Sequence, residues 1–105
     1  MTVSATQISG AYETVAASQT AQVLGGSGLA ADFIAGILVI PESTSPGTVA
    51  LLNNSSSMTI FAGGASSVLT LHPFYIPLNM QSVNGPWKIT TGAAVHVIAT
   101  GNFAV

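Results

Sequence analysis

Residues 85–103 read GPWKITTGAAVHVIATGNF, and apolar and polar side chains alternate along most of this stretch. In WKITT, Trp87 and Ile89 alternate with polar residues, and in VHVIAT the valines alternate with a histidine and an isoleucine. A period of two indicates strands that each turn one face toward a core. A three-residue loop, GAA, would pair Ile89 with Val97 and keep both faces consistent, so we predict a closing β-hairpin here.

The rest of the chain repeats this pattern of strand and turn. Clusters of Gly, Pro, Asn and Ser interrupt it roughly every ten residues, a spacing typical of an all-β sandwich or barrel. The longest apolar run, FIAGILVI, predicts a central strand buried on both faces, and NNSSS predicts a five-residue hairpin loop. About eight strands are predicted in one antiparallel domain, over residues 20–26, 33–40, 48–52, 58–62, 68–72, 73–77, 87–91 and 95–100.

The first part of the chain differs from the rest, because it is poor in large apolar residues and rich in Ala, Thr, Ser and Gln. We therefore predict an N-terminal arm, residues 1–28, followed by a β-sandwich domain, residues 29–105. Two interpretations of the arm stay open: a tail that is disordered alone, or an extended segment that orders against a neighbouring subunit. In the second case the arm residues predicted to form an interface are Tyr12, Val15, Val23 and Leu24.

Charged residues are rare: the chain has one Lys or Arg and three Asp or Glu, and its net charge is −2. Small domains usually stay soluble through a well-charged surface, so we expect subunit contacts to cover much of this one. An oligomer or a larger assembly would provide them. In the closing hairpin, Lys88 and His96 lie on the polar side, opposite Trp87, and we predict that they also belong to an interface.

The same composition excludes several partners. A single Lys and no Arg cannot neutralise a row of phosphates, which argues against nucleic acid and against an anionic membrane surface. The apolar run at 33–40 is far shorter than the ~20 residues of a spanning helix. No basic segment followed by an apolar core opens the sequence, so we expect no signal peptide.

The sequence shows no pattern typical of a metal, cofactor or catalytic site. The two histidines, His72 and His96, are far apart, and neither has an acidic residue at metal-ligand spacing. Three acidic residues make paired-carboxylate chemistry improbable, and no nucleophile motif occurs. We therefore predict no enzyme, no metal and no cofactor. A surface-displayed carbohydrate-binding module, with Phe74, Tyr75 or Trp87 as its platform, is the alternative.

Residues 31–103 also resemble small all-β structural proteins of tailed bacteriophages. The similar segments are the apolar strand ending in Ile-Pro-Glu, then TIFAGG at 59–64, FYIPL at 74–78 and WKIT at 87–90. Many such proteins are capsid decoration, or cement, proteins.

The resemblance implies a jelly-roll-like sandwich that forms a homotrimer. It implies a structural protein of the virion, bound on the capsid exterior at junctions of the major capsid protein, where it stabilises the shell. Such a protein would be made in the host cytoplasm.

Overall fold

The computed structural model describes residues 11–26 and 29–103, and these residues contain eight strands and no helix. The strands are β1 (Ala11–Val15), β2 (Gln22–Val23), β3 (Phe33–Pro41), β4 (Val49–Asn53), β5 (Ser56–Phe61), β6 (Phe74–Gln81), β7 (Trp87–Thr91) and β8 (Val95–Asn102). The predicted all-β fold is therefore confirmed.

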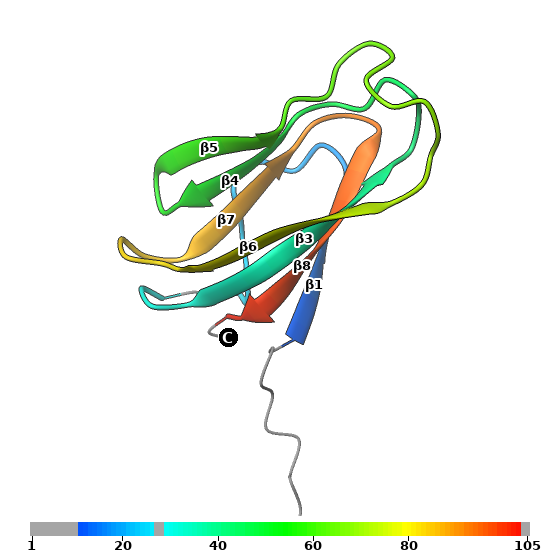
Figure 1. Ribbon diagram of the computed structural model, residues 1–105. Coiled ribbons are helices and arrows are strands. Elements are labelled where there is room, and N and C mark those ends of the chain that lie inside the picture. The colour runs from blue at the N-terminus through cyan, green and yellow to red at the C-terminus, as the bar shows by residue number, and fades with distance from the viewer. Residues whose placement is uncertain (1–10, 27–28, 104–105) are drawn as a thin grey trace, which may run out of the picture.

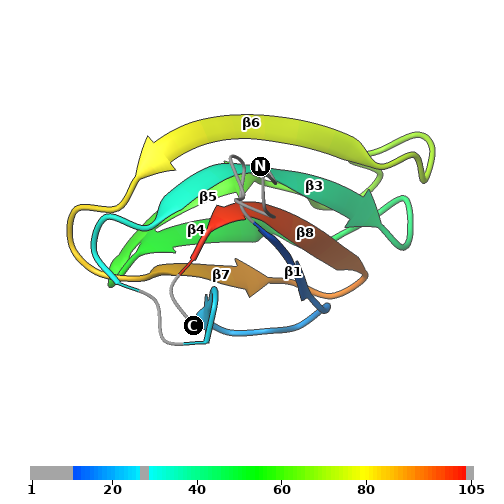
Figure 2. The same cartoon turned by 90° about the horizontal axis from the view of Figure 1, so that it is seen from below.

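Two four-stranded sheets form the sandwich, with strand orders β1-β8-β3-β6 and β2-β7-β4-β5, and every strand pair is antiparallel. Figure 1 shows the two layers, and Figure 2 shows β6, β3, β8 and β1 side by side in front of the other sheet. The strands pair from the ends of the chain inward: β1 with β8, β2 with β7, β3 with β6 and β4 with β5. This nested, Greek-key pairing is the topology of a jelly roll.

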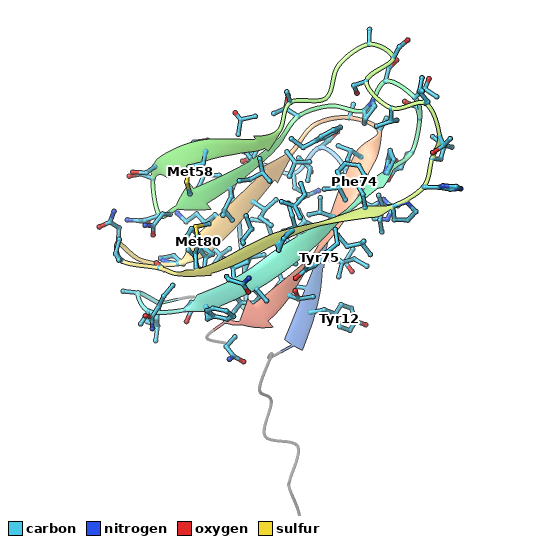
Figure 3. The ribbon with its side chains drawn as sticks, viewed as in Figure 1. Tyr12, Met58, Phe74, Tyr75 and Met80 are labelled. Carbon is cyan, nitrogen blue, oxygen red and sulfur yellow. The ribbon has the colours of Figure 1, made fainter. Side chains whose placement is uncertain are left out.

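Alternating side chains divide each strand between the core and the surface. In β6, Phe74 and Ile76 are half-buried, whereas Tyr75 and Pro77 are exposed. Phe74 and Tyr75 are labelled in Figure 3. The apolar strand β3 lies between β8 and β6, which makes it central as predicted, but only its inner face is buried completely. Leu38 keeps partial exposure, so the prediction of a strand buried on both faces is wrong.

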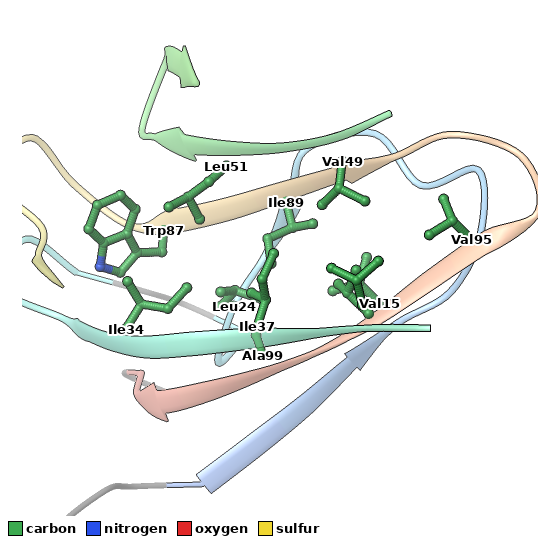
Figure 4. Close-up of a cluster of buried hydrophobic side chains, with 12 residues drawn as sticks. Val15, Leu24, Ile34, Ile37, Val49, Leu51, Trp87, Ile89, Val95 and Ala99 are labelled. Carbon is green, nitrogen blue, oxygen red and sulfur yellow. The ribbon is translucent and has the colours of Figure 1, made fainter. Parts of the chain in front are cut away.

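The core fills the space between the sheets (Figure 4). Its buried hydrophobic residues come from β1, β3, β4, β7 and β8 and from the residue after β2, and partly buried residues of β5 and β6 pack against them. Its members are Val15, Leu24, Ile34, Ile37, Val39, Val49, Leu51, Trp87, Ile89, Val95, Val97 and Ala99. Each large aliphatic side chain buried in this way contributes about 1.5–3 kcal/mol of transfer free energy. Burial on this scale is what holds together a domain with so few ionic contacts.

The boundary predicted at residue 28 differs from the structure. Strand β1 pairs with β8 and strand β2 pairs with β7, so residues 11–23 supply an edge strand to each sheet. At this side of the sandwich Glu13 joins the two sheets: Oε2 accepts a 2.7 Å hydrogen bond from Gln22 Nε2, and Oε1 accepts one of 2.6 Å from Gly25 N. The predicted arm is thus part of the sandwich from residue 11, and residues 1–10 lie outside the described residues.

The predicted closing hairpin is also corrected. The three-residue loop joins β7 to β8 as expected, but β7 pairs with β2 and β4 while β8 pairs with β1 and β3. Ile89 and Val97 therefore enter the core from different sheets and are not cross-strand partners: Ile89 pairs with Leu51, and Val97 pairs with Val39. Alternation fits an arch between sheets as well as a hairpin within one, since both bury the same residues.

Two smaller predictions changed as well. Residues 68–72, predicted as a strand, form irregular backbone in the connection between β5 and β6. The hairpin between β4 and β5 is real, but Asn53 pairs with Ser56, so its loop has two residues, with Asn54 at φ +61°. Asparagine tolerates this left-handed conformation, which two-residue hairpin loops require.

Candidate interaction surfaces

The six predicted interface residues do not lie on one surface. Val15 and Leu24 are fully buried in the core of their own chain, so they are unavailable to a partner of the folded protein. Tyr12 is 70% exposed on β1. Lys88 on β7 and His96 on β8 belong to different sheets and point outward, so they lie on opposite sides of the sandwich. Val23 is half-buried on β2.

The outer surface of the sheet β1-β8-β3-β6 presents several apolar side chains in register. Its rows follow from the strand pairing: Thr14, Ile98, Leu38 and Tyr75 lie side by side across the four strands. The next row consists of Tyr12, Thr100, Gly36 and Pro77. We call the outward residues Tyr12, Leu38, Ile40, Tyr75, Pro77 and Ile98 the apolar sheet face.

The end of the Tyr75 ring lies over Gly36 on this face. A Cβ added to Gly36 would collide with the Tyr75 ring and would come within 2.6 Å of the carbonyl oxygen of Ile76. The Tyr75 hydroxyl reaches Thr100 Oγ1, at 3.4 Å, and Thr100 Oγ1 in turn donates to the carbonyl oxygen of Gly36. Glycine at position 36 therefore lets the ring approach the sheet, and the ring stays 49% exposed.

One ion pair borders the apolar sheet face. His96 Nδ1 lies 2.6 Å from Glu42 Oε2, and His96 is the cross-strand partner of Ile40. Both side chains are partly exposed. Among the described residues this is the one salt bridge, so the charged groups at this end of the face already satisfy each other.

The outer surface of the second sheet has a different character. Its rows are Val23, Lys88, Leu52 and Ser57, and then Thr90, Ala50 and Thr59. A lysine and several hydroxyls interrupt the apolar side chains here, and Thr90 Oγ1 accepts a 2.9 Å hydrogen bond from Ala21 N. We call this surface the hydroxyl face. It resembles an ordinary solvated sheet surface more than the apolar sheet face does.

The aromatic residues do not assemble into a platform for a sugar. Trp87 is 2% exposed, and its Nε1 donates a 2.9 Å hydrogen bond to the carbonyl oxygen of Asp32. Phe74 packs edge-to-face against Phe61, with ring centroids 5.4 Å apart, where the sheets meet at β5 and β6. Tyr75 alone among the three predicted platform residues presents its ring to solvent.

The part of the chain that the structure describes contains no group of three metal-ligating side chains and no pocket. His72 is exposed in the β5–β6 connection, and His96 is occupied by Glu42. Over the same residues, no helix is long and apolar enough to cross a membrane.

The β5–β6 connection exposes further apolar side chains that sequence reasoning assigned to a strand. Leu69 is 92% exposed and Leu71 is 50% exposed. The base of this connection is fixed by hydrogen bonds from Gly64 N to Pro46 O and from Ser66 N to Ser45 Oγ. An apolar run that looks like a strand is here a loop, because no neighbouring strand pairs with it.

Comparison of the chain with protein-family models, with curated proteins and with solved structures gives no match.

Proposed function

We propose that the chain is a non-enzymatic structural protein of a virion, a capsid decoration protein that binds at junctions of the major capsid protein and stabilises the shell. The observation that carries this proposal is the charge-poor surface as a whole: the chain has four charged residues, and its outward side chains are mainly apolar or bear hydroxyls. Apolar, charge-poor patches are typical of the fully buried centres of protein interfaces.

The jelly-roll topology is compatible with this function and does not decide it. Eight-stranded jelly rolls occur in viral capsid domains, and also in lectins and cupins, so function must be argued from the surface residues. In this chain the outward side chains of both sheets are mainly apolar or bear hydroxyls. Such side chains suit extensive interfaces with other subunits. The resemblance to phage structural proteins points the same way, and the homotrimer that it implies remains part of the proposal.

Stabilisation would follow from mass action. A protein that binds the assembled shell and not its separated subunits shifts the equilibrium toward the shell, by about 2.7 kcal/mol per site at a free concentration of 100 Kd. Because the chain has so few charges, this binding would depend little on ionic strength. We place the protein on the exterior of the virion because the resemblance to phage decoration proteins implies that location.

Binding to shells tests the proposal directly. Purified chain is mixed with shells of the encoding virus that lack it, and bound copies are counted after sedimentation while the shells' melting temperature is recorded. We expect saturable binding at a fixed number of sites, a raised melting temperature, and no binding to unassembled major capsid protein. Lys88→Ala, on the hydroxyl face, should bind as the wild type does. An absence of binding to assembled shells would contradict the proposal.

A further inference from the structure

A partner of this sheet could bind on the apolar sheet face or along an edge strand, and the edge strands are poorly suited to binding. The edge strand β6 carries Pro77, which has no N–H to donate, and Asn79 at φ +51°, which distorts the strand. Both features discourage the addition of another strand. The opposite edge, β1, has five residues. A partner of this sheet is therefore expected on its face, where the central strands β8 and β3 present Leu38, Ile40 and Ile98, and where His96 at one end is paired with Glu42.

The rows of this face complement themselves. A twofold axis that runs parallel to the strands, between β8 and β3, places β8 over β3 of a second copy and β1 over its β6. Ile98 then meets Leu38 of the second copy, because these two residues are cross-strand partners within one chain. Tyr12 meets Pro77 of the second copy, since both lie in the row of Thr100 and Gly36. Each contact occurs twice.

The charges on the apolar sheet face and the area that it could bury are both compatible with a second copy of the chain as its partner. The apolar sheet face contains no unpaired ionic group, and His96 at its end is already paired with Glu42, so two copies could meet without burying an isolated charge. Four strands at about 4.8 Å spacing and about 25 Å average length cover roughly 500 Å² per copy. Two such faces bury about 1,000 Å², at the lower limit for a specific interface.

We propose that the apolar sheet face is a twofold interface between two copies of this chain, packed face to face. The two sheets would lie about 10 Å apart, with strands aligned within roughly 30°, as in other stacked sheets. The inference rests on the proposed function only for its expectation of an oligomer. It adds that copies associate in pairs, so a threefold contact would have to use other surfaces and would give six copies.

Cysteine cross-linking tests which face is used, because the natural sequence contains no cysteine. Tyr12→Cys with Pro77→Cys places thiols on the two edge strands of the apolar sheet face. Val23→Cys with Ser57→Cys places them at the corresponding edges of the hydroxyl face, in one row. With a short bis-maleimide, we expect the first pair to give a covalent dimer on a denaturing gel and the second to stay monomeric. Equal yields from the two pairs, or a higher yield from the second, would overturn the proposal.

Matched charge substitutions test the energetics. Leu38→Glu and Leu52→Glu replace half-buried leucines on the apolar sheet face and on the hydroxyl face. Leu38→Glu should weaken dimerisation at least about a hundredfold, because twofold symmetry buries the new charge twice. Leu52→Glu should leave dimerisation unchanged. Circular dichroism confirms folding of each variant, and Tyr12→Lys, at a more exposed position, should also weaken the dimer if Leu38→Glu does not fold.

The same variants separate this inference from the proposed function. If the shell instead covers the apolar sheet face, the wild-type chain is monomeric alone and Leu38→Glu loses shell binding, which overturns the twofold interface. If the chain dimerises through this face but binds no shell, the twofold interface stands and the proposed function fails.

Discussion

Trp87 shows how one residue can be conspicuous in a sequence and serve the core of the fold. Its indole is buried in the core beside Leu51 of β4 and Ile34 of β3 (Figure 4). Its Nε1 donates a hydrogen bond to the carbonyl oxygen of Asp32. This bond ties β7 to the segment that precedes β3. The position of Trp87 in an alternating stretch was sufficient to predict its burial, and the hydrogen bond could not be predicted because it joins residues 55 positions apart.

We expect Trp87→Phe to lower the free energy of unfolding by about 2–3 kcal/mol. Part of the loss is the Nε1 hydrogen bond, which leaves the carbonyl oxygen of Asp32 with one donor fewer, and part is the reduced volume in the core. Tyr75→Phe is the control, because it also removes one polar atom from an aromatic side chain, but from an exposed one. Urea unfolding should show a change below about 0.5 kcal/mol for the control; similar losses for both variants would contradict this account of Trp87.

Gly36 is required by the ring of Tyr75 and by the backbone of β6. Gly36→Ala should destabilise the protein by about 1–3 kcal/mol, because the new Cβ would overlap with the Tyr75 ring and the carbonyl oxygen of Ile76. In a Tyr75→Ala background the cost should fall, since the ring is gone, but should not vanish, since the carbonyl oxygen remains. A double-mutant cycle in urea measures this coupling. Additive effects would show that the ring does not restrain position 36.

At the scale of the element, β1 is the strand that sequence reasoning missed. Its inward-facing residues are Glu13 and Val15, so a charged side chain stands where a strand pattern would have an apolar one. Glu13 is accommodated because Gln22 and Gly25 donate to its carboxylate at the edge of the core. Conversely, residues 68–72 have the composition of a strand and no partner. Local pattern predicts a strand's period and leaves its partner undetermined.

Because local pattern does not determine a strand's partner, β7 and β8 were predicted to pair with each other although they do not. Alternation correctly assigned the buried and outward residues of both strands, and it did not reveal that they belong to different sheets. The candidate surface was only partly visible in the sequence: alternation turns Ile98 outward, but Leu38 looks like a core residue until the strand order places it beside Ile98 on an outer face. The fold class, by contrast, depends on the number and spacing of short strands, which the sequence displays.

Two substitutions test whether β1 belongs to the folded domain. Val15→Asp should unfold the chain or cost at least about 4 kcal/mol, because it buries an unpaired charge in the core. Tyr12→Asp, three residues away on the outer face of the same strand, should change the free energy of unfolding by less than about 1 kcal/mol in dilute protein. Urea unfolding checks both. If Val15→Asp is as well tolerated as Tyr12→Asp, β1 is not held in the sandwich in solution.

For the whole molecule, the two outer faces of the sandwich differ in polarity. One presents the apolar sheet face, and the other presents hydroxyls and Lys88. Salt bridges contribute little to such a fold, because the described residues include one ion pair, on the surface. Stability and association should therefore rest on apolar burial, on hydrogen bonds and on the contacts between copies.

This balance predicts an unusual indifference to salt. Raising NaCl from 0.05 to about 1 M should leave the melting temperature unchanged or raise it slightly, because screening removes almost no favourable interaction while apolar burial is retained. His96→Ala, which removes the ion pair with Glu42, should cost less than about 1 kcal/mol. Differential scanning calorimetry of both proteins across the salt series measures these effects. A fall of the wild-type melting temperature with salt would show that ionic contacts matter more than the structure indicates.

The mass of the purified chain tests the central claim, that its apolar sheet face is an interface between copies. Sedimentation equilibrium should give 21 kDa, twice the 10.5 kDa of one chain, or a further even multiple, with the same value in low and high salt. A stable monomer of 10.5 kDa across the accessible concentrations, or an isolated trimer, would contradict the account.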